Sequence, residues 1–241
     1  MRRFFLETEI TGEEARITGG DARHIRDVLR MSPGGELTLC GPSGREHLCR
    51  IAEIGKKEVL LSVLEEIQGA AEPDMRVTLF QGLPKGDKFE FIIEKAVELG
   101  VFEIIPVAAE RSVPVLGEKA EKKSERWNKI AMAAAKQCGR GRVPRVGPVL
   151  RFRDAIDLAS AMDLAIIPYE KEKSRGLREA ISGFAGSSAA VIIGPEGGFA
   201  PEEISLAEEK GVLPVTLGPR ILRTETAGLF ALSAMGYELM I

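Results

Sequence analysis

Two glycine-bearing turns near the C-terminal end of the chain place the strongest constraint on its fold. The first reads Gly194-Pro195-Glu196-Gly197-Gly198-Phe199, and the second runs from Leu217 to Ala227 and reads L-G-P-R-I-L-R-T-E-T-A. Each turn follows an apolar run and precedes a helical pattern, which predicts two strand–turn–helix units. Because ligands of parallel sheets bind where the strands end, we expect the two turns to form two walls of one small-molecule site.

Apolar strand patterns alternate with helical patterns from Met75 onward. The expected strands are 77–81, 102–107, 164–168, 189–193 and 212–217, and the expected helices are 85–99, 118–138, 154–161, 175–182, 201–210 and 224–240. This alternation predicts an α/β domain with a mostly parallel sheet that helices cover on both faces.

The first 70 residues show a different pattern. Short strands are expected at 3–6, 36–40, 47–54 and 58–67, with Gly41-Pro42-Ser43-Gly44 as a hairpin loop. Asp21 suits the N-cap position of a helix over 21–30. We therefore expect a small β-barrel domain over residues 1–70, a linker near 68–73, and the α/β domain over 74–241.

The composition disfavours several classes of protein. The chain has 241 residues, of which 44% are hydrophobic and 29% charged, as in ordinary soluble domains. No apolar run approaches the ~18–20 residues that span a bilayer, and the N-terminus lacks the apolar core of a secretory signal. A cytoplasmic location without a membrane partner is expected. Three cysteines without a C-x-x-C pair predict no disulfide framework, and Cys40, His47 and Cys49 match no common zinc spacing, so no metal is expected.

Positive charge is concentrated in residues 111–151. This stretch holds eleven Lys or Arg against three Glu, a net of +8 in a chain whose formal net charge is −3. Such asymmetry indicates a polyanion partner such as RNA. A solvated helix face with i, i+4 pairs accounts for residues 118–126, but not for the glycine-rich stretch 137–145. The candidate RNA contacts are Arg2, Arg3, His24, Arg26, Arg30 and Arg45 in the N-terminal domain and Arg111, Arg140, Arg142 and Arg145 in the C-terminal one.

The first glycine turn differs from a phosphate-binding loop. It contains neither Lys nor Ser/Thr and places Glu196 beside the glycines, which disfavours a nucleoside triphosphate or a dinucleotide. Bare backbone beside a carboxylate suits an uncharged heterocycle or a cation, and S-adenosylmethionine offers both an adenine and a sulfonium. The alternative interpretation is that the glycines only make tight turns and that Pro201 only begins the next helix.

Both turns resemble the cofactor-site motifs of the SPOUT methyltransferases, and the whole chain resembles the bacterial 16S ribosomal RNA uracil-1498 N3-methyltransferase family. The stretches that carry the wider resemblance are Arg2–Phe5, His24–Arg30, Pro84–Lys88, Glu110–Val113 and Gln137–Pro144. The resemblance implies a PUA-like β-barrel followed by a SPOUT-type α/β domain that is closed by a trefoil knot. It also implies S-adenosylmethionine as cofactor, a homodimer, and 16S rRNA of the 30S subunit as substrate. General rules of chain topology would argue against a knot.

The resemblance places the cofactor in three loops that follow strands. The residues expected to bind it are Pro168, Tyr169, Gly194, Pro195, Glu196, Gly197, Gly198, Leu217, Gly218, Ile221, Leu222, Arg223, Thr224 and Thr226. Glu225 is the expected catalytic carboxylate, with Arg223 as its electrostatic partner, although an acid in a first helical turn also stabilises that helix. Two alternatives stay open: a SPOUT methyltransferase with another RNA target, and a non-catalytic RNA-binding protein with a vestigial pocket.

Overall fold

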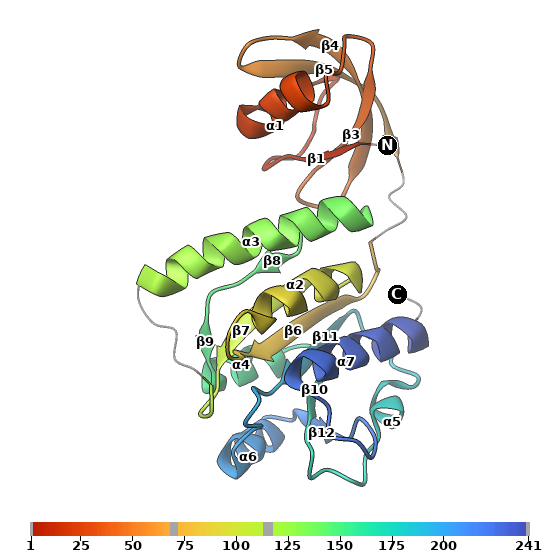
Figure 1. Cartoon of the computed structure of the whole chain (residues 1–241). Helices are drawn as coiled ribbons and strands as arrows, with labels where there is room; N and C mark the ends of the chain where they lie inside the picture. The colour runs from red at the N-terminus through yellow and green to blue at the C-terminus, as the bar shows by residue number, and fades with distance from the viewer. Residues whose placement is uncertain (1, 68–71, 113–117, 240–241) are drawn as a thin grey trace. The chain divides into compact units, whose positions relative to one another are not determined.

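The computed structural model describes residues 2–67, 72–112 and 118–239. The chain divides into two compact units, which Figure 1 colours by residue number. Unit 1 comprises the residues up to Glu72 together with Ala135–Val143, and unit 2 comprises Pro73–Ala134 together with the residues from Pro144 onward. The expected linker at 68–73 falls largely outside the described residues.

Unit 1 is built on one five-stranded sheet. Its strands are β1 (Arg3–Phe5), β2 (Glu14–Thr18), β3 (Glu36–Cys40), β4 (Glu46–Ile54) and β5 (Glu58–Ile67), in the order β1-β3-β4-β5-β2. The β1–β3 pair is parallel and the other pairs are antiparallel. Among the described residues the pairing ends at β1 and β2, so the small barrel that was expected is an open half-barrel. The sequence prediction missed β2, because only Ala15 and Ile17 of this strand are apolar.

A short helical segment follows β2 directly. Helix α1 (Gly19–Arg23) continues into one π-helical turn, η1 (His24–Val28). Thr18 is the N-cap residue of α1 and Asp21 lies in its first turn, so the prediction that Asp21 caps the helix was wrong. The helix begins two residues earlier than expected because it starts where β2 ends. Ala22 and Ile25 pack into the core of unit 1 with Leu37, Leu39 and Ile51.

The segment 135–143 is organised by one carboxylate of unit 1. Helix α3 (Glu118–Cys138) is followed by Gly139, whose φ of 80° is the left-handed conformation that ends many helices. Arg140 is 3% exposed, and its Nε and Nη2 donate to Glu72 over 3.1 and 2.7 Å. The backbone N–H groups of Gly141 and Arg142 donate to the same carboxylate over 3.0 and 3.1 Å. Arg140, a candidate RNA contact, is therefore a buried structural residue.

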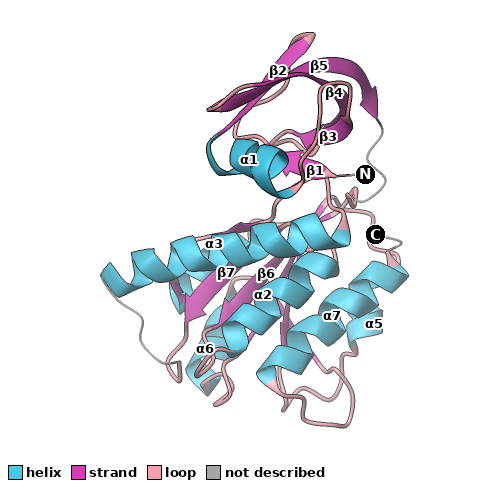
Figure 2. Ribbon diagram, turned by 45° about the horizontal axis from the view of Figure 1, so that its top comes forward, coloured by secondary structure: helices cyan, strands magenta, loops and turns pink. Residues whose placement is uncertain are grey.

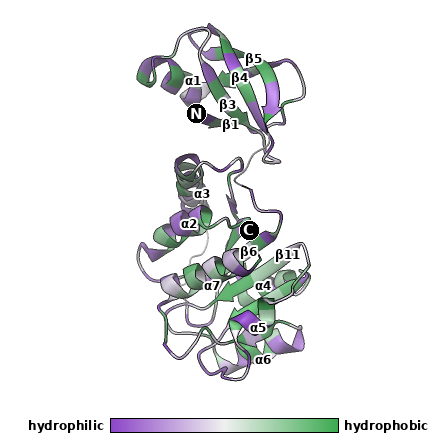
Figure 3. Cartoon of the chain, turned by 90° about the vertical axis from the view of Figure 1, so that its right-hand side faces the viewer, coloured by the Kyte–Doolittle hydropathy of each residue, from purple (hydrophilic) through white to green (hydrophobic). Residues whose placement is uncertain are grey.

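Unit 2 is built on a parallel sheet. Its strands are β12 (Leu213–Val215), β10 (Leu164–Pro168), β11 (Ser188–Ile193), β6 (Arg76–Gly82), β7 (Glu103–Ala108) and β8 (Arg145–Val146), in that order, with β9 (Leu150–Arg151) also on β7. Every pairing is parallel. The central strands β6 and β11 are almost entirely buried, and β11 is a nearly continuous apolar run, as expected of a sheet covered on both faces (Figure 3).

Helices cover the two faces of this sheet (Figure 2). Ala190 and Ile192 of β11 pack in one apolar cluster with residues of α4 (Phe152–Ala159) and α6 (Pro201–Glu209). The next residue, Ile193, lies 3.6 Å from where a Cβ would stand on Gly228 of α7 (Thr224–Glu238). Because alternate residues of a strand point to opposite faces, α7 covers the other face.

The remaining helices of unit 2 gather around α7. Both α2 (Lys88–Glu98) and α5 (Leu177–Ile181) contact it. Helix α3 packs on α2 through Trp127 and Phe89, whose ring centroids are 4.6 Å apart. Among the described helices, none combines the length and the apolar composition needed to cross a bilayer.

The chain returns across the sheet after its last strand. Strand β12 is the edge strand beside β10, whereas α7 packs on β11 and β6. The segment between β12 and α7, residues 216–223, therefore passes the carboxyl ends of β10 and β11. The resemblance places the trefoil knot in this part of the chain.

Arg140→Ala tests the structural role of the buried arginine. Its loss leaves Glu72 without two charged hydrogen bonds, so the free energy of unfolding should fall by about 1.5–3 kcal/mol in urea denaturation. Arg145→Ala is the control, because Arg145 is exposed, and it should change stability by less than about 0.5 kcal/mol. Equal effects of the two variants would contradict the assignment.

Candidate active site

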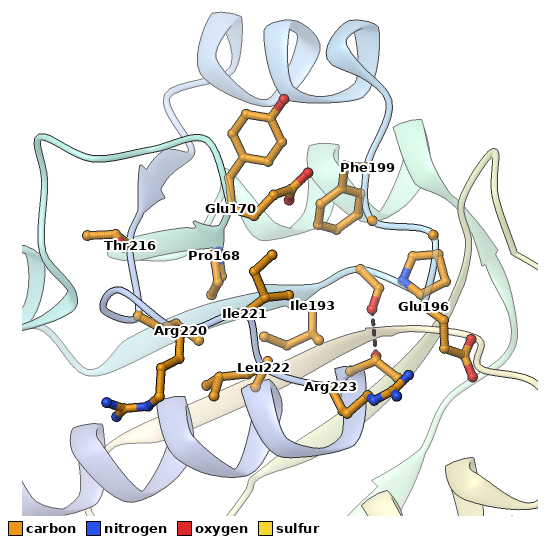
Figure 4. A pocket seen from close by; sticks show the side chains of 18 of the residues that line it. Pro168, Glu170, Ile193, Glu196, Phe199, Thr216, Arg220, Ile221, Leu222 and Arg223 are labelled. Atoms are coloured by element: carbon orange, nitrogen blue, oxygen red, sulfur yellow. Dashed lines mark hydrogen bonds between the residues drawn. The ribbon is translucent and has the colours of Figure 1, made fainter.

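A cleft of ≈ 610 Å³ opens at the carboxyl ends of β10, β11 and β12 (Figure 4). Three loops line it, after β10, β11 and β12, with Ala227 of α7. Of the fourteen residues expected to bind the cofactor, all but Thr226 line the cleft. The volume falls in the range of ~300–1,000 Å³ typical of small-molecule sites. The two glycine turns therefore lie in one cleft.

A hydrogen-bond relay joins the two turns. Gln81, at the end of β6, is fully buried, and its Nε2 donates to Thr224 Oγ1 over 2.9 Å. Thr224 Oγ1 in turn donates to the carbonyl oxygen of Gly194 over 2.6 Å. Sequence reasoning missed Gln81. The signal that could have found it is a single amide side chain near the end of an otherwise buried strand. Because a buried polar group needs hydrogen-bond partners, such a residue predicts a contact with a neighbouring loop.

Close backbone contacts explain two glycines of the site. A Cβ on Gly82 would lie 2.6 Å from the nitrogen of Pro195, and one on Gly194 would lie 3.2 Å from the ring of Phe199. Phe199 is itself buried and packs on Phe152 at a centroid distance of 5.4 Å. The first turn is thus held against β6 on one side and on an aromatic pair on the other.

The loop after β7 braces the first turn. Arg111 Nη1 donates to the carbonyl oxygen of Gly197 over 2.9 Å. Buried Glu203 of α6 accepts from the backbone N–H of Glu110 and of Ala200, both over 2.9 Å. Arg111 was expected as an RNA contact, and the structure places one of its donors on the first glycine turn. Pro201 begins α6, as expected.

Glu196 turns its carboxylate toward the start of α2. The carboxylate accepts from Lys85 N–H over 3.1 and 3.2 Å and from Lys88 Nζ over 3.2 Å. Partial burial raises the pKa of Glu196, but the hydrogen bonds from its own N–H, Lys88 and Lys85 together hold that pKa below its usual value. In Figure 4 the carboxylate points away from Ile221, which projects into the cleft. The ionised Glu196 side chain therefore fixes the turn.

The two expected catalytic residues lie at the N-terminus of α7. Arg223 is its N-cap residue, is exposed, and lines the cleft. Glu225 is half-buried and does not line the cleft; its Oε2 lies 3.5 Å from Lys88 Nζ. The cleft is also lined by residues outside the fourteen expected to bind the cofactor, namely Glu170, Ile193, Phe199, Thr216, Pro219, Arg220 and Ala227. Most of them belong to the same three loops.

The expected RNA contacts of unit 1 differ in exposure. Arg2, His24, Arg30 and Arg45 are exposed. Arg3 forms an ion pair with buried Glu46, and Arg26 binds Asp27 over 2.7 Å and the carbonyl oxygen of Lys56 over 2.5 Å. Exposed basic side chains therefore remain on this unit, while Arg3 and Arg26 also support its fold.

Comparisons with known proteins agree with this architecture. A family model described as an RNA methyltransferase domain matches residues 71–236, and one described as an RNA methyltransferase PUA domain matches residues 17–64. Ribosomal RNA small subunit methyltransferase E of Bacillus subtilis is 41% identical over 99% of this chain and 97% of its own length.

The chain belongs to the ribosomal RNA small subunit methyltransferase E family.

Solved structures of relatives superpose over nearly the whole chain. The Neisseria gonorrhoeae methyltransferase E, bound to S-adenosyl methionine, has a TM-score of 0.87 and 34% identity and covers 98% of this chain and 97% of its own. A putative methyltransferase of Legionella pneumophila in complex with the same cofactor has a TM-score of 0.83 and 32% identity, covering 98% and 96%. The expected fold class, a PUA-like domain followed by a SPOUT-type α/β domain, is confirmed.

Thr224→Val tests the relay in this methyltransferase family member. It removes the hydroxyl that joins Gln81 to Gly194, so S-adenosylmethionine affinity, measured by calorimetry, should fall about 5- to 20-fold, the equivalent of one or two net hydrogen bonds. Thr226→Val is the matched control on the same helix, because Thr226 is exposed and outside the cleft. A relay without a role in binding would give the two variants equal affinities.

Proposed function

We propose that this protein transfers the methyl group of S-adenosylmethionine to N3 of a uridine in 16S rRNA, the uracil-1498 position, on the small ribosomal subunit. The relatives are named as small-subunit ribosomal RNA methyltransferases. The position of the methylated uridine is our inference from the sequence resemblance. The observation that carries the proposal is the single cleft formed by both glycine turns at the carboxyl edge of the parallel sheet.

The residues of the cleft suit S-adenosylmethionine. Gly194–Gly198 and Leu217–Leu222 line the cavity, and Ile221, 89% exposed, offers an apolar side chain to a flat heterocycle. These segments would hold the adenosyl moiety by backbone hydrogen bonds and apolar contact. When bound, the cofactor supplies an electrophilic methyl group on a sulfonium.

The residues at the start of α7 would act on the uracil. Its N3 carries a proton, and in a duplex it is paired, so the base must be unpaired or turned out of its stack. Arg223 lines the cleft with an exposed guanidinium, which would stabilise the negative charge that develops on the uracil carbonyl oxygens. Glu225, two residues further, would accept the N3 proton.

Exposed basic residues would position the RNA. Arg2, His24, Arg30 and Arg45 are exposed in unit 1, and Arg220 and Arg223 are exposed at the cleft. Such side chains supply the phosphate contacts that make RNA binding depend on salt. We propose the assembled 30S subunit as the substrate and the cytoplasm as the location.

Helix α7 also supports the proposed homodimer. Phe230 is 43% exposed and Tyr237 is 88% exposed, and their spacing of seven residues puts them on one side of the helix. The opposite side packs on β6 and β11. A second copy of the chain that covers this stripe would bury two aromatic side chains, which are enriched at such interfaces.

Nucleotide-resolution mapping tests the proposed reaction. We expect 30S particles from cells that lack this activity to gain one methyl group, at N3 of a single 16S uridine, when incubated with the protein and S-adenosylmethionine. Glu225→Gln should slow the transfer about 10²–10⁴-fold with unchanged cofactor affinity. A methyl group on a ribose hydroxyl or on tRNA would favour the alternative SPOUT target, and absence of transfer with intact cofactor binding would favour a non-catalytic RNA-binding protein.

Tyr237→Glu tests the dimer. A charge in the apolar stripe should shift the protein from dimer to monomer in sedimentation velocity, because an unpaired charge opposes burial. Leu158→Glu is the control, since Leu158 is 50% exposed on α4, away from α7. If the wild-type protein sediments as a monomer, the proposed dimer is incorrect.

A further inference from the structure

Three charged side chains from three separate elements meet beside the cleft. Lys88 is the first residue of α2, Glu196 belongs to the first glycine turn, and Glu225 lies in the first turn of α7. Lys88 Nζ lies 3.2 Å from Glu196 Oε1 and 3.5 Å from Glu225 Oε2. One ammonium group therefore bridges the two turns that form the walls of the site.

The burial of these groups shows how much the arrangement depends on Lys88. The side chains of Lys88, Glu196 and Glu225 are 38%, 23% and 24% exposed. Glu225 Oε2 is buried and accepts no hydrogen bond from the described residues. Since a buried carboxylate oxygen needs a compensating charge or donor, the Lys88 ammonium is the group that holds Glu225 in place.

The two carboxylates differ in their other contacts. Glu196 also accepts from Lys85 N–H, over 3.1 and 3.2 Å, so it keeps partners when Lys88 is absent. Among the described residues, Lys88 is the one cation that pairs with Glu225. Without Lys88, the two like charges would also repel each other. Removal of the ammonium group should therefore displace Glu225 more than Glu196.

We propose that Lys88 is a positioning residue for methyl transfer. Its ammonium group pairs with Glu196 of the first glycine turn and with Glu225, and it thereby fixes the position of the Glu225 carboxylate relative to that turn. The proposal rests on the proposed function, because it gives Glu225 a role in the reaction. The reaction would then depend on Lys88, which lies on α2 and outside the cleft. Lys88 does not line the cleft, so its proposed effect on the reaction is exerted through Glu225.

A double-mutant cycle tests this coupling. Lys88→Met should lower kcat about 10²-fold, the loss expected when a reacting group is misplaced by about 1 Å, and should leave the KM for S-adenosylmethionine within a factor of three. In a Glu225→Gln background the same substitution should have no further effect on kcat, because residues that act as one unit are not additive. Lys88→Arg, which keeps the charge, should recover most of the rate.

The matched control is Lys95→Met on the same helix. Lys95 forms ion pairs of 2.9 and 2.7 Å with Glu94 and Glu98, so this variant also loses two ion pairs of α2. It should retain the wild-type kcat, and thermal melting should show both variants folded. Equal losses of kcat from Lys88→Met in the wild-type and Glu225→Gln backgrounds would overturn the proposal, as would a loss no larger than that of Lys95→Met.

The outcomes separate this proposal from the proposed function. If the wild-type protein methylates a different nucleotide, the proposed function fails at its target, yet the cycle still reports on Lys88 and Glu225 with that substrate. If the wild-type enzyme methylates N3 of the uridine and Glu225→Gln is as fast, the positioning role of Lys88 and the proton-accepting role of Glu225 are overturned, while the proposed reaction and its target stand.

Discussion

The hydrogen-bond relay from Gln81 through Thr224 to Gly194 is the interaction on which the site depends. The relay joins Thr224 to Gly194, which are 30 residues apart in the sequence. Each glycine turn is irregular backbone that no strand pairing holds in place. The buried Gln81 amide on the central strand β6 donates to the Thr224 hydroxyl over 2.9 Å, and that hydroxyl donates to the Gly194 carbonyl oxygen over 2.6 Å, so both turns are tied to β6. Gly82 allows the approach, because any side chain there would collide with Pro195. A rigid strand thus sets the width of the cleft.

Several basic residues of the stretch 111–151 form ion pairs within their own unit. Arg140 is bound to Glu72, Arg126 lies 2.7 Å from Glu90, and Lys136 lies 3.2 Å from Asp21. These residues belong to the basic stretch 111–151, whose charge pointed to RNA. Part of that charge supports the fold, so the exposed arginines at the cleft and in unit 1 carry more of the proposed RNA contact.

Helix α7 connects three properties of the protein. Its N-terminus carries Arg223, which lines the cleft, and Glu225, which lies beside it; its inner side covers β6 and β11, and its outer side leaves Phe230 and Tyr237 exposed. A partner on the outer side would therefore restrain the helix that also carries the proposed reacting groups. This arrangement gives a physical reason for a dimer to affect the geometry of the cleft.

The sequence by itself determined the alternation of strands and helices, the parallel sheet, and thirteen lining residues of the cleft. The strands, helices and sheet follow from local apolar periodicity and turn residues, whereas the list of lining residues follows from the resemblance to the SPOUT cofactor motifs. Tertiary structure alone decided the open half-barrel, the place of 135–143 in unit 1, the burial of Arg140, and the roles of Gln81 and Lys88. Each of these depends on which distant residues become neighbours, and a local pattern does not encode the partner of a buried polar group.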